Sequence, residues 1–514
     1  MMLKNNQGII LFCFIIFALF VDMPLLETFS DGVDFTIAGN FLGIPHPPSY
    51  PAFTLVVNLL KYLPFGSHVF RTNFLTLIIS SLFLFFVFKA FRANFIEKVM
   101  FFLILLTSKT FFSNAKIGEV YVLNLFIIFL LYRCLFQEDI RFFYLTGFLS
   151  GLGMGIHHTV IFMTLFLVSY NMCLKKNFRF VDWSLWLFFF ILGFSVYIYL
   201  PVRASCNPLW NWGAPKNFLL FLNSFFRHDF SSKGIIRSFD TLIEQIKSFN
   251  PVYEFGYING FFVIVCFLFY VFVKRNGLDK LILVLIYFTG ILIVVGDDDL
   301  SFNERLETYA VFFLPAYFFM LYSACEYIRD LKHLKSKYVA ILISFIGVLV
   351  HVCDNNFKDS NSYQKLVFPH DYGRFNLSML PLDSVLIVQG GEKDFPAIYQ
   401  QRVCKFREDI KIVTLTSLGK FWNLKESLLL GAAYKTFPES PYDKLNVLKS
   451  TILYQKEVLK KRVFTNIYDE QKLPLMDWQF NGIFKELGSG SKLDKEYFLR
   501  LRGKGSDNGF LNNF

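Results

Sequence analysis

The sequence predicts an all-α polytopic membrane protein with a small α/β domain at its C-terminal end. Of its 514 residues, 54% are hydrophobic and 68 are Phe, and the mean hydropathy of +0.45 exceeds what a soluble domain usually carries. Apolar runs of near-spanning length recur up to residue 353, whereas the following part is richer in charge. We therefore predict a transmembrane domain over 1–353, an α/β domain over 354–502 and a flexible tail over 503–514.

The apolar runs predict the membrane helices one by one. The first run, Gly8 to Val21, has no small-residue cleavage site after it, so we interpret it as an uncleaved anchor. Residues 141–174 are too long for one crossing and contain GLGMGIHH, which predicts two helices that turn at His157 and His158. The other runs are 70–91, 95–107, 119–136, 183–200, 257–273, 280–296, 307–328 and 338–353.

Short clusters of Lys and Arg between these runs predict the orientation, because such clusters stay on the cytoplasmic side. They lie at 89–98, 133–141, 175–179, 274–280 and 329–337. Placing all of them inside gives about eleven crossings, an inner N-terminus and an outer C-terminal domain. Polar residues of the predicted outer loops, 22–69 and 202–256 among them, then collect on one face. An outward-facing site is the hypothesis that follows.

The charge pattern also excludes some classes of protein. The net charge of +11 lies mostly in these orientation clusters, so we expect no nucleic-acid partner and take the lipid bilayer as the main one. The eight cysteines lack metal-ligand spacing and predict neither a zinc site nor a disulfide framework. The predicted helix interiors carry few charges, which favours chemistry at the membrane surface over transport through the bundle.

The candidate functional residues lie in the predicted outer segments. Asp31 and Asp34 follow the first helix, and if a helix begins there, their i,i+3 spacing puts both carboxylates on one face. His46 lies within the PHPP run, whose prolines keep its loop pre-organised. Further candidates on the same side are Tyr50, Glu119, His157, His158, Arg203, Trp210, Trp212 and Arg305.

Each candidate also has a purely structural interpretation. Two acids after a first helix are most often solvated loop residues, and a His pair at a turn is often only a polar cap. Trp210 and Trp212 either stack on a sugar or anchor the membrane interface. The acidic run 297–299 would suit a divalent cation but is usually just hydrated, so we expect no metal site.

The C-terminal region predicts a β-α-β unit. SVLIVQG at 384–390 and IKIVTLT at 410–416 are runs rich in β-branched residues, and the helical AIYQQRVCKF lies between them. Residues 444–462 are typical of an amphipathic helix.

Several blocks of the sequence resemble a known family. D-x-x-D at 31–34, followed by GIPHPPSYPAFTL and LPFGSHVFRTNFLT, resembles the start of the DUF2723 family, which includes the TMEM260-type protein O-mannosyltransferases. The resemblance continues in order through AKIGEVYVLN, GLGMGIHHT, YLPVRASCNPLWNWGAPKN, RLETYAVFFLPAY and the strand-like tail region 380–413. It therefore covers most of the chain.

The resemblance implies a glycosyltransferase of the GT-C type. Such an enzyme moves a sugar, here a mannose-like hexose, from a polyprenyl-phosphate donor to an acceptor hydroxyl on a protein or glycan outside the cytoplasm, with inversion and without a cofactor. The reaction needs a base, and the family's catalytic acid in the first outer loop matches Asp31 and Asp34. We take Asp31 as the general base, with Asp34 either orienting the acceptor or raising the pKa of Asp31.

The remaining candidates are assigned by what the reaction requires. The departing phosphate needs donors, and Arg203 suits it best because a guanidinium holds phosphate oxygens bidentately, with His157, His158 and Arg305 as weaker candidates. The residues expected to bind substrate are His46, Tyr50, Glu119, Trp210 and Trp212.

The sequence departs from the family at three places. The family usually has Gly where Val33 stands, Glu where Asp34 stands and Gly where Ser49 stands. The alternative function is therefore a non-catalytic protein of the same fold, or a transporter or flippase of lipid-linked sugars in envelope glycan assembly. Phe and Lys usage, with no eukaryotic retention signal, favours a bacterial inner membrane.

Overall fold

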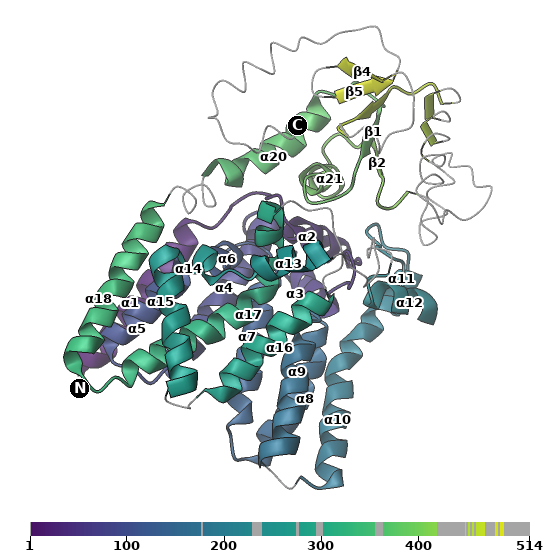
Figure 1. The fold of residues 1–514 in the computed structure, drawn as a ribbon. Coiled ribbons are helices and arrows are strands. Elements are labelled where there is room, and N and C mark those ends of the chain that lie inside the picture. Colours follow the sequence, from purple (N-terminus) through teal and green to yellow (C-terminus); the bar gives the residue numbers. More distant parts are fainter. Residues whose placement is uncertain are drawn as a thin grey trace.

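The computed structural model shows a helical bundle with a small sheet domain at one end (Figure 1). It describes residues 2–175, 178–228, 239–273, 277–294, 302–354, 363–418, 448, 451–452, 455–456, 459–467, 478–481 and 484–487.

Each predicted apolar run forms a helix. The long elements of the bundle are α1 Met2–Val21, α4 His68–Ala90, α5 Phe95–Leu106, α7 Tyr121–Leu135, α8 Ile140–Met154, α9 Val160–Tyr170, α10 Phe180–Phe194, α15 Tyr257–Leu268, α16 Leu278–Val294, α17 Phe302–Arg329 and α18 Leu334–Cys353. The two helices predicted within 141–174 are confirmed as α8 and α9, which join at His157 and His158.

Shorter elements connect the long helices. Their apolar stretches are too short to be predicted as membrane spans from the sequence. They are α2 Asp31–Phe41, α3 Pro51–Leu60, α6 Lys109–Asn114, η1 Asn171–Lys175, η2 Ser195–Ile198, α11 Tyr199–Ser205, α12 Phe218–Phe225, α13 Phe239–Ser248, α14 Pro251–Phe255 and η3 Phe269–Val273. A helix does begin at Asp31, and this helix is α2. Figure 1 shows α2 at the end of the bundle that faces the sheet domain.

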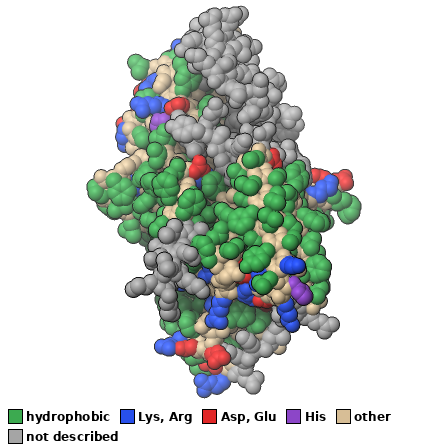
Figure 2. Space-filling view, turned by 90° about the vertical axis from the view of Figure 1, so that its left-hand side faces the viewer, with side chains coloured by type: hydrophobic (Ala, Val, Ile, Leu, Met, Phe, Trp, Pro, Cys, Tyr) green, Lys and Arg blue, Asp and Glu red, His purple; other side chains and the backbone are tan. Residues whose placement is uncertain are grey.

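The surface of the bundle suits a membrane. By length and composition, four helices among the described residues can cross one: His68–Ala90, Phe180–Ser205, Arg305–Arg329 and Leu334–Cys353. The pair Phe239–Phe255 and Tyr257–Val273, bent by 108°, would make a fifth. Figure 2 shows hydrophobic side chains covering a broad band of one face, with charged side chains mainly beyond it. The count of about eleven crossings stays a prediction.

The C-terminal domain contains the predicted β-α-β unit. Strand β1 Val385–Val388 lies parallel to β2 Lys411–Thr414 and to β3 Val463–Thr465, while β5 Phe484–Leu487 runs antiparallel to β3 and to β4 Trp478–Asn481. The strand order is β2-β1-β3-β5-β4. The helix α21 Phe395–Arg402 connects β1 to β2, and α20 Tyr363–Ser378 precedes the sheet. Most of the amphipathic helix predicted over 444–462 lies outside the described residues.

The sheet domain packs directly on α2. One face of the sheet, including Leu386 and Val388, joins Phe395 of α21 and the α2 residues Val33 and Ile37 in a single buried apolar cluster. The opposite face, including Val385 and Ile387, builds a separate cluster within the domain. Period-two alternation along β1 therefore divides its side chains between the bundle and the domain's own core.

Candidate active site

Two carboxylates occupy the first turn of α2, and their environments differ. Ser30 caps the helix, since its Oγ accepts the Gly32 N–H at 3.2 Å. The Asp31 side chain is 27% exposed, whereas that of Asp34 is fully buried, at 0%. The first-turn position suits both anions because the helix dipole is positive there. Of the two, Asp31 is the carboxylate that a substrate can reach.

His46 joins the two carboxylates. Its Nδ1–H donates to Asp34 Oδ2 at 2.7 Å, and its Nε2 lies 3.4 Å from Asp31 Oδ2. Asp34 also accepts the His46 backbone N–H at 3.0 Å and the Trp210 Nε1–H at 2.5 Å. Both acids therefore lie on one face, as predicted. Because both Asp34 oxygens are occupied, its role in the structure is to orient His46 rather than to meet an acceptor directly.

The predicted outer loops 22–69 and 202–256 are held against each other at this point. The Ile44 N–H donates to Trp210 O at 2.8 Å, and the Trp212 N–H donates to Ile44 O at 3.1 Å. Gly43 permits this approach, because a Cβ there would lie 2.4 Å from Trp210 O. The contact brings the Trp210 indole to Asp34.

Arg203 lies at the far end of α2 from Asp31. Its Nε–H donates to Leu42 O at 2.8 Å and its Nη2–H to Phe41 O at 3.4 Å, so the guanidinium caps the C-terminal end of the helix. An α2 of this length separates its two ends by about 15 Å. The structure thus gives Arg203 a helix-capping role, and its predicted contact with donor phosphate stays a prediction.

Glu119 supports the start of α2 from the second outer loop. Its Oε1 accepts the Gly32 N–H at 3.0 Å, while Oε2 has no hydrogen-bond partner although Glu119 is only 5% exposed. The approach is close because Gly32 faces Gly118, where a Cβ on Gly32 would lie 3.1 Å from the Gly118 carbonyl carbon. Burial first, and then Asp31, raise the pKa of Glu119 well above its ordinary value.

The two histidines of the α8–α9 turn are neutral; His157 is buried and His158 is half-buried. Burial lowers the pKa of each to about 3. The Thr159 backbone N–H donates to His157 Nδ1 at 3.3 Å, so Nδ1 is an acceptor. It also accepts the Thr159 Oγ1–H at 2.8 Å, and the proton of the neutral His157 ring is on Nε2. His158 Nε2–H donates to Tyr197 OH at 2.8 Å. The ring proton of His158 is therefore used by Tyr197, and only His157 keeps an N–H for the phosphate contact predicted for both rings.

Aromatic rings connect the α8–α9 turn to the acid pair. Tyr50 contacts His46, with ring centroids 5.1 Å apart, and His157, at 6.0 Å. His157 also contacts Phe312 of α17 at 5.7 Å. Arg305 lies seven residues before Phe312, about two turns toward the outer end of the same helix face. The structure therefore brings Asp31, His46, Tyr50 and His157 together, while Arg305 lies on the same face of α17 as Phe312.

The charges around Asp31 set its protonation. Desolvation raises the pKa of Asp31, His46 lowers it, Asp34 raises it and Arg227 lowers it, and the net change is upward. Burial lowers the pKa of His46, but the two carboxylates outweigh it and raise that pKa above its ordinary value. The like-charge effect of Asp34 on Asp31 was predicted, and it is present but secondary to desolvation.

Two charged residues near the site were not predicted. Arg227, just after α12, is exposed, and its charge acts on Asp31, His46 and both turn histidines. Glu392, between β1 and α21, acts on Glu119 and is itself affected by Asp31 and His46. Nothing local in the sequence of the turn at 390–394 signals that it reaches α2.

Other predicted residues lie elsewhere. Trp212 is 7% exposed and belongs to the apolar cluster between α2 and the sheet domain, so its ring neither stacks openly on a sugar nor anchors the membrane interface. The acidic run 297–299 lies outside the described residues. Among the residues that the structure does describe, no group of three His, Cys, Asp or Glu side chains is placed to hold a metal ion.

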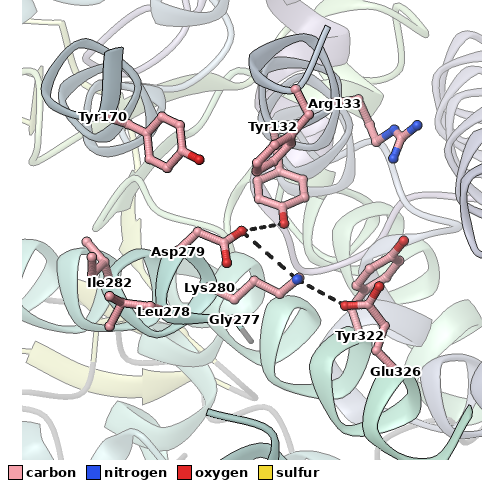
Figure 3. A pocket seen from close by; sticks show the side chains of 11 residues that line it. Tyr132, Arg133, Tyr170, Gly277, Leu278, Asp279, Lys280, Ile282, Tyr322 and Glu326 are labelled. Atoms are coloured by element: carbon pink, nitrogen blue, oxygen red, sulfur yellow. Dashed lines mark hydrogen bonds and ion pairs between the residues drawn. The ribbon is translucent and has the colours of Figure 1, made fainter. Parts of the chain in front are cut away.

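A separate cavity of about 470 Å³ lies at the other end of the bundle. Tyr121 is the first residue of α7 and contacts His157. Tyr132, in the cavity wall, lies on the same helix about 16 Å further along its axis. Figure 3 shows Lys280 between two carboxylates, with Nζ 3.0 Å from Glu326 and 4.0 Å from Asp279. Arg329 also pairs with Glu326, and Tyr132 OH of α7 donates to Asp279 at 2.6 Å. We therefore interpret the group as a polar link between α7, α16 and α17.

Comparisons of sequence support the predicted family resemblance. A family model described as the protein O-mannosyl-transferase TMEM260 N-terminal domain matches residues 31–180. The protein O-mannosyl-transferase TMEM260 of Mus musculus is 25% identical over 226 residues, which is 41% of this chain and 32% of that protein. The matched part of the chain thus spans about a third of the length of this relative. The family match begins at Asp31, the first residue of α2.

Comparison of structures confirms the fold class. The crystal structure of ArnT from Cupriavidus metallidurans bound to undecaprenyl phosphate is similar to this chain with a TM-score of 0.53 and 11% identity. The similarity covers 89% of this chain and 92% of the ArnT chain. The chain therefore shares the GT-C fold of ArnT, while the number of membrane crossings stays a prediction.

Proposed function

We propose that the protein is a GT-C glycosyltransferase that moves a mannose-like hexose from a polyprenyl-phosphate donor to a hydroxyl on a protein, at the outer face of a bacterial inner membrane. The observation that carries the proposal is the Asp31–His46–Asp34 group at the start of α2. One carboxylate is open, the second is buried, and the imidazole between them is fixed.

Asp31 is the general base of this proposal. It accepts the proton of the acceptor hydroxyl while the oxygen attacks C1 of the sugar from the side opposite the phosphate, which inverts the anomeric centre. A raised pKa makes the Asp31 carboxylate a stronger base than an ordinary one. His46, held by Asp34, positions that carboxylate and balances its charge while the sugar passes through an oxocarbenium-like state.

The C1–O bond to the polyprenyl phosphate breaks in the same step, and the phosphate leaves with the bonding electrons. Its negative charge needs a cation or several N–H donors. Arg227 is the cation whose charge acts on the Asp31 group, so we assign it this role. The neutral His157, with its proton on Nε2, is a second donor.

The donor and acceptor classes rest on the comparisons. ArnT was crystallised with undecaprenyl phosphate, and this chain has the same fold. TMEM260, which matches the part that contains Asp31, is a protein O-mannosyl-transferase. These two observations favour a polyprenyl-linked mannose and a Ser or Thr acceptor.

The test is transfer by the purified protein in detergent. Polyprenyl-phosphate mannose with a labelled sugar is incubated with Ser/Thr peptides, and the anomer of the product is determined. The proposal predicts a glycosylated peptide whose anomeric configuration is opposite to that of the donor. If no acceptor is modified, but the reconstituted protein moves the labelled lipid across vesicles, the protein is a flippase and the proposal is wrong.

A further inference from the structure

The sheet domain forms part of the mouth of the candidate active site. Helix α21 lies against α2, and Trp210, the partner of Asp34, contacts Phe395 with ring centroids 6.5 Å apart. Glu27, which precedes α2, is 3% exposed, pairs with His370 and accepts the Gln400 Nε2–H at 2.8 Å. Apolar and polar contacts thus fix the domain beside Asp31.

The loop of residues 389–394, which follows β1, is held rigidly above α2. Gly390 has φ of +85°, a value that favours glycine, and its N–H donates to Asp394 Oδ2 at 2.7 Å. Asn466 Nδ2–H donates to Asp394 Oδ1 at 3.0 Å, and Thr416 Oγ1–H donates to Gly390 O at 3.2 Å. The carboxyl ends of β1, β2 and β3 all support this loop, and in α/β domains this is the edge where ligands bind.

Glu392 is the side chain that this loop presents to the site. It is exposed, and no hydrogen bond or ion pair joins it to the described part of the chain. Its charge nevertheless acts on Glu119, and it is affected by Asp31 and by His46. A loop fixed by hydrogen bonds therefore holds, within electrostatic range of Asp31, a carboxyl group that has no partner among the described residues.

The charges near Asp31 favour different sides of the site for the donor phosphate and for the acceptor. An anionic phosphate is attracted by Arg227 and repelled by carboxylates, so it belongs on the Arg227 side. Asp31, together with Glu392 once it is ionised, makes the opposite side negative, whereas Glu119, with its raised pKa, adds little charge. A group bound there must supply N–H or ammonium donors.

We propose that Glu392 contacts the acceptor, and that the acceptor is a polypeptide with a Lys or Arg next to the modified Ser or Thr. This inference rests on the proposed glycosyltransferase function. The sheet domain then supplies acceptor specificity, while the bundle supplies the donor site and the base.

The test compares two peptides that differ in charge at one position. Both carry the same Ser, flanked in one by Lys and in the other by norleucine, which has a similar length but no charge. The wild-type protein is expected to prefer the Lys peptide about tenfold in kcat/KM, mainly through KM, which is the value of one charge-assisted hydrogen bond. Glu392→Gln is expected to lose this preference and to use the Lys and norleucine peptides with equal kcat/KM.

A matched control and a pH series separate contact from structural effects. Glu408→Gln makes the same change at an exposed residue of the domain, paired with Lys405, and is expected to keep the preference. Although the Glu392 side chain is exposed, the surrounding protein still desolvates its carboxyl group. This desolvation, and then Asp31, raise its pKa to about 8, while His46 lowers it. The preference for Lys should therefore grow as pH rises through that range, and Glu392→Gln should abolish the change.

The outcomes distinguish the two proposals. Equal use of both peptides by the wild type, or an unchanged preference in Glu392→Gln, overturns the role of Glu392 but leaves the glycosyltransferase intact. Transfer to glycans and to no peptide overturns the polypeptide acceptor. Transfer to no acceptor at all overturns the proposed function itself.

Discussion

Asp34 is the residue whose replacement tests the geometry of the site most sharply. In Asp34→Asn, one of its two oxygens becomes an NH₂ group. Because His46 makes both of its hydrogen bonds to Oδ2, the better orientation keeps that oxygen and turns the NH₂ toward Trp210 Nε1–H. Two donors then face each other at 0% exposure.

The expected cost follows from these contacts. A buried donor left without an acceptor costs about 1–3 kcal/mol. The bond from His46 also loses its anionic acceptor, which halves its strength at a further cost of about 1 kcal/mol. We therefore expect Asp34→Asn to lower the free energy of unfolding by about 2–4 kcal/mol and to lower the pKa of His46.

The assay is a double-mutant cycle with Trp210→Phe, measured by chemical and thermal unfolding in detergent. Trp210→Phe removes the opposing donor, so the double variant should be more stable than the sum of the two single effects predicts, by about 1 kcal/mol or more. Purely additive effects, or a loss below about 0.5 kcal/mol in Asp34→Asn, would refute the hydrogen-bond network described above.

Three further predictions concern the same site. Ser49→Gly should change the unfolding free energy by less than about 1 kcal/mol, because relief of the φ of +77° offsets the lost bond to Ser224 Oγ at 2.9 Å; a large loss of thermal stability would contradict this. Arg227→Gln should weaken binding of polyprenyl phosphate about tenfold in a thermal-shift titration, and unchanged binding would remove Arg227 from the phosphate site. The rate should rise with pH through a pKa of Asp31 above its ordinary 3.8, and Arg227→Gln should move this limb to higher pH, since Arg227 lowers that pKa; a limb that moves the other way would exclude Asp31 as the group observed.

Much of the fold could be predicted because its signals are local. A long apolar run has few alternatives to a helix, and GLGMGIHH interrupts one with glycines, so the α8–α9 turn at His157 was found correctly. The β-branched runs at 384–390 and 410–416 likewise gave β1 and β2. The acid pair was found because its spacing matches one helix face.

The rest of the site depends on contacts between distant segments. Sequence identifies Arg203 as a cation at a membrane boundary, but only the fold shows that its donors are used by the carbonyls at the end of α2. Arg227 and Glu392 lie in segments without a local signal, and the packing of α12 and of the sheet domain brings them to Asp31. Tertiary placement, rather than residue type, decides which charges take part.

The central claim is that Asp31 is the base of a glycosyl transfer, and single-turnover kinetics with Asp31→Asn test it most directly. Preformed protein–donor complex is mixed with excess acceptor peptide, and labelled product is followed over time. Asp371→Asn, the same change at an exposed residue of α20, is the control. We predict that Asp31→Asn binds polyprenyl-phosphate sugar as the wild type does but transfers it at least about 10²-fold more slowly, as expected for loss of a general base. Transfer at the wild-type rate in Asp31→Asn would contradict the account.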